Sequence, residues 1–600
     1  MRQPGLPRPR KFPIISKRIY AAAVLISLAA AFAGYAMRAQ LIPVAGRAIN
    51  YYRTWNAAPG TLTIETTQSE GPARPIAPGG TPPTPPDASP DWPSYNRTLT
   101  SERYSPLSQI NLANVHTLKV SCTYDTRQYS SFQTGPIIVN GSLVGTTEQD
   151  IFSIDPATCR EHWRAHENSG HAAVNRGAAY LDGLVYRGTG DGRVLAYDFK
   201  TGARVWQSTI ANPNMGESVP SAPIAWNGLI FIGSAGGDRK GGKGRMYALD
   251  AKTGRIVWEF FLVPKGPNDV ARGPEGASPL NSSTWENQAG TPISGGATWT
   301  SYTLDPASGE LYVPTGNSAP DFARDVRKGA NLYSGSVVVL DAKTGAYKRH
   351  FSLTSGDWHD WDVSNTPALV RTRSGKLLLS VAPKDGYLYG FNLDSSALIY
   401  RTAVTRIENA DAPFSTDRPV HFCPGTRGGA EWNGPAYDPR TNLIFIGEVD
   451  WCSSIRIQSN AKIAAAKPGS VWGAETHNPF DIFGTQEPYQ QWVGWVYAAD
   501  ADTGAWRWRA KTNYPIQSGV TTTAGGLVFF GDMGGNFYAL DSGSGRRLWG
   551  ENLGSAIGGG VVTYSVGGEQ KVAVATGFTA ILWPTKVTTG KIVILSLPGN

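Results

Sequence analysis

Cysteine and helical periodicity are both scarce in this chain. Its 600 residues include four cysteines, and no Cys-x-x-Cys-His motif occurs, so we expect no covalently attached c-type haem. Few stretches show the apolar period of an amphipathic helix, which argues against a helical fold. The net charge is +8, but no cluster of basic and aromatic residues indicates nucleic-acid binding. These absences leave a mainly β protein with no nucleic-acid partner.

Glycine is abundant, at 69 of 600 residues, and a sequence motif that ends in Trp occurs several times. In Leu195 to Trp206 and in Tyr247 to Trp258, an apolar strand leads through a turn to a second strand that ends in Trp. The Asp that begins the turn can accept backbone N–H groups two residues on, and Gly supplies the positive φ. The turn residue, Asp or in one copy Asn, is followed eight positions later by the residue that ends the motif, which is Trp in most copies. The turn residues lie at positions 155, 198, 250, 341, 392, 500 and 541.

These copies predict an all-β, eight-bladed β-propeller over residues 91–600. Neighbouring copies are 41 to 52 residues apart, close to the length of a four-stranded blade, and gaps of 91 and 108 residues leave room for further hairpins. Residues 304–313 and 437–446 resemble such hairpins without the Trp. We expect the last strand, 591–596, to close the ring by pairing with strands near the start of the domain.

The region before the propeller carries an export signal. Residues 1–18 are basic, residues 19–37 contain no charge, and residues 38–90 include a Pro-rich stretch. A run of this length can span a bilayer, and its basic flank stays in the cytoplasm. We expect a single-pass anchor at the periplasmic face of the inner membrane, followed by an extended linker. Ala31-Phe-Ala33 also resembles a signal-peptidase site, so a cleaved signal remains the alternative.

The four cysteines suit an oxidising compartment. Cys122 and Cys159 lie in the first blade region, and Cys423 and Cys452 flank a later hairpin. Two disulfides are expected, although spacing alone leaves their pairing open.

Several polar and aromatic residues do not belong to the repeated motif and could form one site at the end of the central channel. They offer carboxylates and an amide oxygen for Ca²⁺, cations for an anionic cofactor, and an aromatic ring for stacking. Each has a structural alternative: Asp238 could be a turn residue, Asp362 a loop cap, and Trp299 part of the core. The set comprises Arg176, Asp238, Trp299, Asn317, Asp362 and Lys384.

The chain resembles the pyrroloquinoline quinone (PQQ)-dependent alcohol dehydrogenases, a family of eight-bladed quinoproteins. The resemblance is carried by residues 91–97, 103–111 and 521–531 and by the order of the off-pattern residues, and it covers roughly residues 90 to 600. It implies the cofactors PQQ and Ca²⁺ and oxidation of an alcohol or sugar hydroxyl to a carbonyl. It also implies that electrons pass to ubiquinone or to a separate cytochrome c.

The resemblance assigns a role to each site residue. Asp362, in Trp361-Asp-Val-Ser364, matches the catalytic base and a metal ligand, and Ser364 stands where lanthanide-using relatives carry a second acid, which favours Ca²⁺. Asn317 and Asp238 match further Ca²⁺ ligands. The residues that match cofactor contacts are Trp299 beneath the quinone, Arg176 at its carboxylates, Lys384 beside its reactive oxygens, and Gly236.

Two departures from the family pattern put activity in question. Asp238 stands where the family usually has Glu, which shortens that ligand by one methylene group. Gly170 and His171 replace the adjacent cysteine pair that many relatives stack on the cofactor. His171 is either a stacking lid, as in the membrane glucose dehydrogenases, or a solvated loop residue. The rival readings are a non-catalytic periplasmic scaffold, like the outer-membrane assembly factor, and a degenerate quinoprotein.

Overall fold

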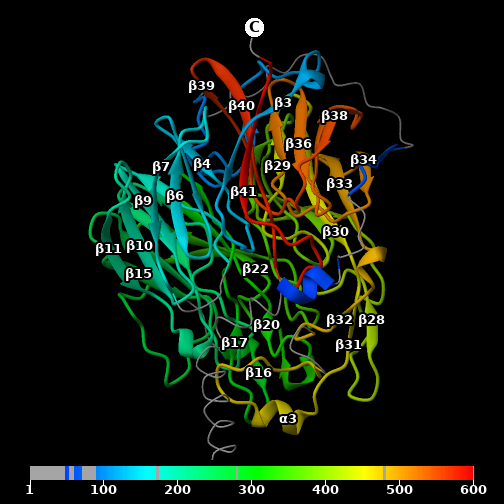
Figure 1. Ribbon diagram of the computed structural model, residues 1–600. Coiled ribbons are helices and arrows are strands. Elements are labelled where there is room, and N and C mark those ends of the chain that lie inside the picture. The colour runs from blue at the N-terminus through cyan, green and yellow to red at the C-terminus, as the bar shows by residue number, and fades with distance from the viewer. Residues whose placement is uncertain are drawn as a thin grey trace, which may run out of the picture.

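The computed structural model shows an all-β, propeller-like fold (Figure 1). It describes residues 47–52, 54, 60–69, 89–169, 174–278, 282–476, 481–580 and 582–598. Within these residues, eight sheets contain at least four antiparallel strands each, and the first strands of several neighbouring sheets contact one another.

The first four sheets are meanders of consecutive strands, apart from two short strands between β19 and β22 that pair with short strands preceding the fourth sheet. Their strands are β4 (Ile137–Val139), β5 (Ser142–Thr146), β6 (Asp150–Ile154) and β7 (Glu161–His166); β8 (Ala179–Leu181), β9 (Leu184–Gly188), β10 (Arg193–Asp198) and β11 (Arg204–Thr209); β12 (Ile224–Trp226), β13 (Leu229–Gly233), β14 (Arg245–Asp250) and β15 (Ile256–Phe261); β18 (Thr303–Asp305), β19 (Glu310–Pro314), β22 (Ser336–Asp341) and β23 (Tyr347–Ser352).

The next three sheets continue the same pattern, and two of them gain a strand from the N-terminal part of the chain. Their strands are β24 (Ala368–Arg371), β25 (Leu377–Val381), β26 (Tyr387–Asn392) and β27 (Leu398–Ala403); β29 (Ala436–Asp438), β30 (Leu443–Asp450), β33 (Val493–Asp500) and β34 (Trp506–Thr512), with β1 (Ile64–Gln68); β35 (Thr521–Thr523), β36 (Leu527–Gly531), β37 (Asn536–Asp541) and β38 (Arg547–Asn552), with β2 (Tyr104–Ser105).

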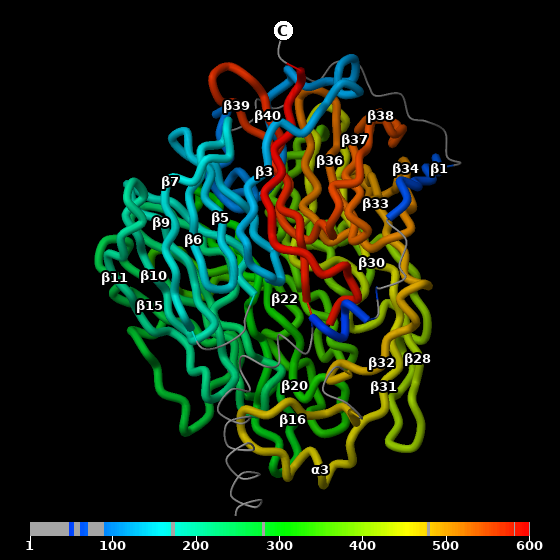
Figure 2. Tube along the Cα trace, in the orientation of Figure 1, coloured from blue at the N-terminus to red at the C-terminus, as the bar shows by residue number. Residues whose placement is uncertain are grey.

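The eighth sheet closes the ring. It joins β39 (Val561–Val566), β40 (Glu569–Thr576) and β41 (Lys591–Ser596) to β3 (Lys119–Asp125). Strands β3 and β41 are antiparallel and run side by side in Figure 2, where the two ends of the chain's colour scale meet. The expected closure by residues 591–596 is therefore confirmed.

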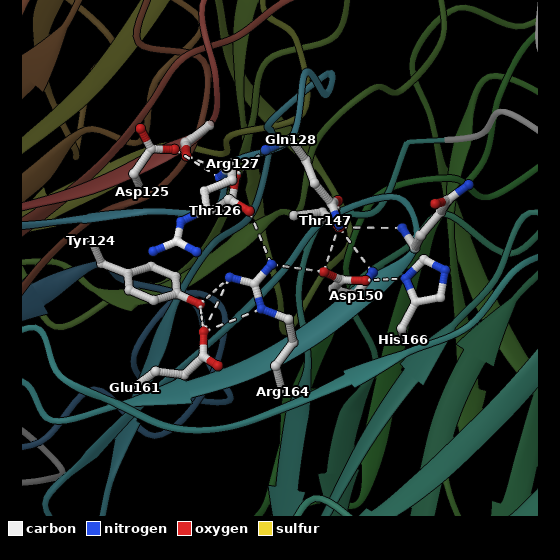
Figure 3. A network of polar contacts seen from close by, with 12 residues as sticks. Tyr124, Asp125, Thr126, Arg127, Gln128, Thr147, Asp150, Glu161, Arg164 and His166 are labelled. Atoms are coloured by element: carbon white, nitrogen blue, oxygen red, sulfur yellow. Dashed lines mark hydrogen bonds and ion pairs between the residues drawn. The ribbon is translucent and has the colours of Figure 1, made fainter.

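A polar network ties the closing sheet to the first meander (Figure 3). The Arg164 guanidinium on β7 donates to the Tyr124 hydroxyl of β3 at 2.6 Å and to Asp150 Oδ2 of β6 at 3.0 Å. The Asp150 carboxylate also contacts Nδ1 of His166 at 2.6 Å and accepts from the Gln128 amide at 2.6 Å. These bonds hold β3 against β6 and β7, beside the Cys122–Cys159 disulfide that joins the same two sheets.

The Trp that ends each repeat fastens one sheet to the next. In four copies the indole lies against the turn glycine of the following sheet, where a Cβ atom on that glycine would be 2.5–2.6 Å from the ring. These glycines have φ between 68° and 74°, a conformation that favours Gly. Because they carry no side chain, they also leave space for the indole ring. The indole N–H groups of Trp163, Trp206, Trp258 and Trp508 donate to the carbonyls of Phe199, Ala251, Ala342 and Ser542, respectively.

Parts of the segment predicted to be a linker, residues 38–90, are packed on the propeller. Strand β1 pairs with β34, and Asn50, in a helical turn over residues 47–52, donates to the carbonyls of Ala580 and Trp583 at 2.6 and 3.0 Å. The uncharged run 19–37 and the stretch 70–88 lie outside the described residues. No helix among the described residues is long and apolar enough to span a membrane.

Two disulfides, Cys122–Cys159 and Cys423–Cys452, pair the four cysteines. The first joins β3 to the turn after β6, and the second joins the residue after β28 to the residue before β31, two strands that pair with each other. Short elements lie mostly in insertions at one end of the propeller: β16 (Glu286–Asn287), β17 (Ser294–Gly295), β20 (Ser318–Ala319), β21 (Arg327–Lys328), β28 (Val420–Phe422), β31 (Ser453–Ile455), β32 (Thr485–Gln486) and α3 (Asn460–Ala465).

Candidate active site

The loops that flank the inner strands of several sheets meet around a cavity of about 500 Å³. Each loop starts or ends at a β-strand, so the sheets hold its polar side chains at fixed positions around the axis. Because the contributing residues follow strands of different sheets, closing the ring is what brings them together. Six of the residues proposed from the sequence line this cavity: Arg176, Gly236, Asp238, Trp299, Asp362 and Lys384.

Asp362 is the best-supported acid–base group of the cavity. It lies in the loop before β24, is buried, and has both carboxylate oxygens engaged. Oδ1 accepts the backbone N–H of Asn317 at 3.0 Å, and Oδ2 lies 2.8 Å from Nζ of Lys384. A buried carboxylate with an adjacent cation can accept a proton from a hydroxyl group placed in the cavity.

Lys384 follows β25 and connects two carboxylates. Its Nζ is 2.8 Å from Asp362 and 3.4 Å from Asp360, and it lies 5.5 Å from the centre of the Trp299 ring. Burial disfavours the ammonium, but the two carboxylates outweigh this effect and hold the pKa of Lys384 above its usual range. The side chain therefore remains a cation between the acids and the cavity wall.

Three carboxylates gather beside this pair. Oxygens of Asp238, Asp321 and Asp360 all lie within 4.8 Å of one another, which is a spacing that one metal ion can span. Burial and the charge of Asp362 raise the pKa of Asp238 to about 6. Asn317 lies between Asp321 and Asp362, since its side-chain amide donates to Asp321 Oδ1 at 3.0 Å. The structure thus places two of the predicted metal ligands, Asp238 and Asn317, at one acidic cluster.

Aromatic rings and a guanidinium form the opposite part of the wall. Arg176 lies 4.6 Å from the centre of the Trp299 ring and 5.3 Å from that of Trp432. Its Nη1 donates to the Trp299 carbonyl at 2.8 Å, while its buried Nε has no hydrogen-bond partner among the described residues. Burial lowers the pKa of Arg176 to about 10, so the guanidinium stays charged at neutral pH. This arrangement suits a flat anionic ligand.

Gly236 lines the cavity with φ at 104°, and a Cβ atom there would be 2.6 Å from the Gly216 carbonyl. A side chain is therefore excluded at this point of the wall. His171, the predicted lid, and Gly170 lie outside the described residues, and the role of His171 stays a prediction.

The sequence reading missed several residues of the cavity region. Asp360 and Asp321 belong to the acidic cluster, and buried Glu431, whose pKa burial raises to about 7, lines the same cavity with Trp432. Asn50 of the N-terminal helical turn lines it as well. Two of these acids lie close in sequence to proposed site residues, which is the signal that could have identified them: Asp360 precedes Asp362 by two positions, and Asp321 follows Asn317 by four. No local signal marks Glu431 or Asn50, because only the tertiary structure brings them to the cavity.

Gly316 offers a test of the carboxylate position. A Cβ atom at this residue would lie 2.6 Å from Asp362 Oδ1, so the carboxylate must move in a Gly316→Ala variant. We expect turnover to fall by about tenfold to a hundredfold, because misplacing a catalytic group by about 1 Å costs on the order of a hundredfold. Steady-state kinetics and a melting curve measure the two effects separately. Gly266→Ala is the control, since its nearest neighbour would be 3.4 Å away. Undiminished turnover in Gly316→Ala would contradict this position for the base.

Comparison with known proteins agrees with this site. The family model described as the PQQ β-propeller domain of glucose, ethanol and alcohol dehydrogenases matches residues 92–403. That range contains Arg176, Asp238, Asn317, Asp362 and Lys384. A second model, for the outer membrane protein assembly factor BamB, matches residues 493–593, where two of the Trp repeats lie.

Individual relatives cover most of the chain. The dehydrogenase subunit of alcohol dehydrogenase (quinone) from Komagataeibacter europaeus is 30% identical over 542 residues, which cover 82% of this chain and 72% of that protein. A lanthanide-dependent methanol dehydrogenase from Methylacidiphilum fumariolicum is 27% identical, over 81% of this chain and 84% of that protein.

Among solved structures, the quinohemoprotein alcohol dehydrogenase ADHIIG from Pseudomonas putida superposes with a TM-score of 0.76. It is 26% identical, over 85% of this chain and 81% of that one. With the family model matching residues 92–403 and a relative 30% identical over 82% of its length, the chain belongs to the PQQ-dependent alcohol dehydrogenase family of β-propeller proteins.

Proposed function

We propose that the chain oxidises the hydroxyl group of an alcohol or a sugar to a carbonyl, with PQQ and a metal ion as cofactors and Asp362 as the general base. The observation that carries this proposal is the pairing of buried Asp362 with Lys384 at 2.8 Å in the wall of the cavity. A non-catalytic propeller has no need for a buried carboxylate and ammonium at the end of its channel.

The residues present fit both cofactors. Trp299 and Trp432 offer ring faces, Arg176 offers an unpaired N–H, and the acidic cluster offers oxygen ligands that include an unpartnered carboxylate oxygen of Asp321. When bound, PQQ supplies the oxidant, since it takes up the hydrogen and the two electrons of the substrate C–H bond.

The chain's own groups would then act on the proton and on orientation. Asp362 takes the proton of the substrate hydroxyl, and Asn317, whose backbone N–H donates to Oδ1, holds the carboxylate plane in position. The Lys384 ammonium, 2.8 Å from Oδ2, holds the carboxylate from its other side. Arg176 binds anionic groups against the Trp299 ring and fixes the ligand in the cavity.

A dye-linked assay tests this function. The purified chain, reconstituted with PQQ and a metal ion, is offered a series of primary alcohols, cyclic polyols and aldoses with an artificial electron acceptor. We expect dye reduction that needs both PQQ and one class of these substrates. If PQQ binds but no alcohol or sugar reduces the dye, the chain is a degenerate member of its family.

The second candidate is an assembly scaffold, and it is favoured by the match of residues 493–593 to the assembly factor. That match covers the docking repeats but none of the acids, cations or rings assigned to the catalytic step. The scaffold would function equally well with Asp362 and Lys384 replaced, so retained cellular function in such variants would support it.

The remaining proposals concern architecture and location. We infer that the eight sheets are eight blades, and that the propeller is exported and held at the periplasmic face of the inner membrane by residues 19–37, or released there if the signal is cleaved. Two disulfides support an oxidising compartment. From there, electrons would pass to ubiquinone or to a separate cytochrome c. Fractionation of cells that produce the full chain, with N-terminal sequencing, distinguishes the anchored form from the cleaved form.

A further inference from the structure

The N-terminal helical turn over residues 47–52 forms part of the wall of the candidate active-site cavity. Arg47 and Asn50 line the cavity, although both precede residue 92, where the match to the propeller family model begins. We propose that Arg47, Asn50 and Gln133 form a subsite for substrate hydroxyl groups, and that the substrate is a polyhydroxylated compound, such as an aldose or a cyclic polyol. This inference rests on the proposed function, which places the oxidised hydroxyl group at Asp362.

Hydrogen bonds hold this turn on the segment that leads to β41. The Asn50 amide donates to the carbonyls of Ala580 and Trp583 at 2.6 and 3.0 Å, and Asn50 is fully buried. In Figure 2 the blue turn lies beside the red segment that precedes β41. Because Ala580 and Trp583 line the cavity themselves, the N-terminal turn extends the wall that they form.

Residues 129–133 supply the neighbouring part of this wall. The backbone of Ser131 forms a β-bridge with Phe578, which lies just before the segment that binds the N-terminal turn. The Arg47 guanidinium lies 5.2 Å from the centre of the Tyr129 ring, and both residues line the cavity. These two contacts place residues 129–133 beside the N-terminal turn, so the two segments form one surface.

Two buried oxygens on this surface have no hydrogen-bond partner among the described residues. They are Oδ1 of Asn50 and Oε1 of Gln133, a cavity-lining residue that is 4% exposed. The side-chain N–H group of Gln133, in contrast, donates to the Ser131 hydroxyl at 3.0 Å. Leaving a buried acceptor unpaired is costly, and a hydroxyl group of a bound molecule would remove that cost by donating to it. We therefore expect ligand hydroxyl groups at these two oxygens.

The same surface also offers hydrogen-bond donors. Arg47 brings a guanidinium, whose nitrogen atoms only donate. A hydroxyl group both donates and accepts, so one molecule with several hydroxyl groups can use the guanidinium and the two amide oxygens together. Trp583, which is 6% exposed, adds an apolar wall against which the C–H face of a sugar or cyclitol ring can pack.

A simple alcohol would make poor use of this surface. Its single hydroxyl group is needed at Asp362, where the proton is removed, so the oxygens of Asn50 and Gln133 would gain no partner from it. A site that is built to hydrogen-bond a substrate hydroxyl group rejects the analogue that lacks it, because the site's own polar groups are then left unpaired. The unpartnered oxygens therefore favour a substrate with hydroxyl groups beyond the one that is oxidised.

Two matched pairs of substrates test this class. The full chain, reconstituted with PQQ and a metal ion, is assayed with myo-inositol and cyclohexanol, and with D-glucose and tetrahydropyran-2-ol, which lacks the other hydroxyl groups of the sugar. We expect kcat/KM of the polyhydroxylated member of at least one pair to exceed that of its partner by about a hundredfold or more. A smaller ratio in both pairs would overturn the proposal.

Variants locate the subsite. Gln133→Met keeps the length of the side chain without its polar atoms, and Arg47→Met removes the guanidinium. For the polyhydroxylated substrate, each should raise KM by about tenfold with little change in kcat, whereas KM of the bare analogue should stay within about twofold. Arg47→Lys, which keeps a cationic donor, should recover part of the loss.

The control for these variants is Arg127→Met, at an exposed cation two residues before Tyr129. It should behave as the parent chain does with both members of each pair. If Gln133→Met and Arg47→Met are indistinguishable from this control, neither residue binds the substrate and the subsite is refuted.

Equilibrium binding separates this inference from the proposed function. Quenching of tryptophan fluorescence by myo-inositol or D-glucose, in the reconstituted Asp362→Asn chain, measures affinity without turnover. A chain that binds one of them, and binds it more weakly once Gln133 is replaced, yet reduces no dye as the parent keeps the subsite and loses the oxidation. A chain that oxidises cyclohexanol as readily as the polyols keeps its function and loses the subsite. Circular dichroism identifies a misfolded variant, and in that case the matched pairs on the parent chain decide alone.

Discussion

Replacing Asp362 by Asn is expected to lower kcat by about 10²- to 10⁴-fold, the usual contribution of a general base. The amide cannot accept the substrate proton, although it can still accept the Asn317 N–H that now reaches Oδ1 at 3.0 Å. The loss should therefore appear in turnover, while binding of PQQ, followed by its absorbance, is largely retained. Stopped-flow reduction of the bound cofactor by substrate measures the affected step directly.

The control for this variant is Asp325→Asn, which removes one carboxylate from an exposed position. It should turn over like the parent chain. Because Asp362 also pairs with Lys384 at 2.8 Å, a fall in melting temperature is expected as well, and cofactor titration separates it from the chemical effect. Near-normal kcat in Asp362→Asn would show that another group, such as Glu431, takes the proton.

Truncating Trp258 to Ala is expected to destabilise the propeller by about 3–5 kcal/mol, the range for removing a large buried aromatic side chain. Trp258 is 2% exposed, its indole donates to the Ala342 carbonyl at 3.0 Å, and its ring fills the space over Gly345. The variant loses this packing and leaves a cavity between two neighbouring sheets. Chemical denaturation followed by tryptophan fluorescence and circular dichroism measures the effect.

Val205→Ala provides the comparison, since Val205 is 51% exposed on β11 and should change stability by no more than about 0.5 kcal/mol. A Trp258→Phe variant keeps most of the ring and loses the N–H donor. It should lie between the two. Equal stability of Trp258→Ala and Val205→Ala would mean that the repeated Trp does not fasten the sheets.

The repeat could be read from the sequence because its chemistry is local. Asp198 accepts the N–H groups of Lys200 and Thr201, within three residues of itself, and Gly202 has φ at 72° in the same turn. Such contacts depend on spacing along the chain alone. For the same reason the closing strand 591–596 and the weaker hairpins could be predicted, since alternating apolar residues mark a strand wherever it pairs.

The candidate site was only partly predictable. Asp362 and Lys384 stood out because they departed from the repeat and matched a family pattern. Asp321 did not, although its unpartnered Oδ2 is among the clearest indications of a bound ion. Its meaning comes from Asp238 and Asp360, which lie on loops of other sheets, and no spacing along the chain expresses that proximity.

The sequence by itself determined the strands, the turns and the Trp contacts of this propeller, together with a set of polar residues that the scaffold does not require. The tertiary structure alone decided how these residues combine: that Lys384 lies between Asp360 and Asp362, that Gly316 leaves room for the base, and that oxygens of three carboxylates lie within 4.8 Å of one another. The physical reason is range. Turn and strand preferences act over a few residues, whereas the charge of a site is a sum over side chains that only closure of the ring brings within a few ångströms.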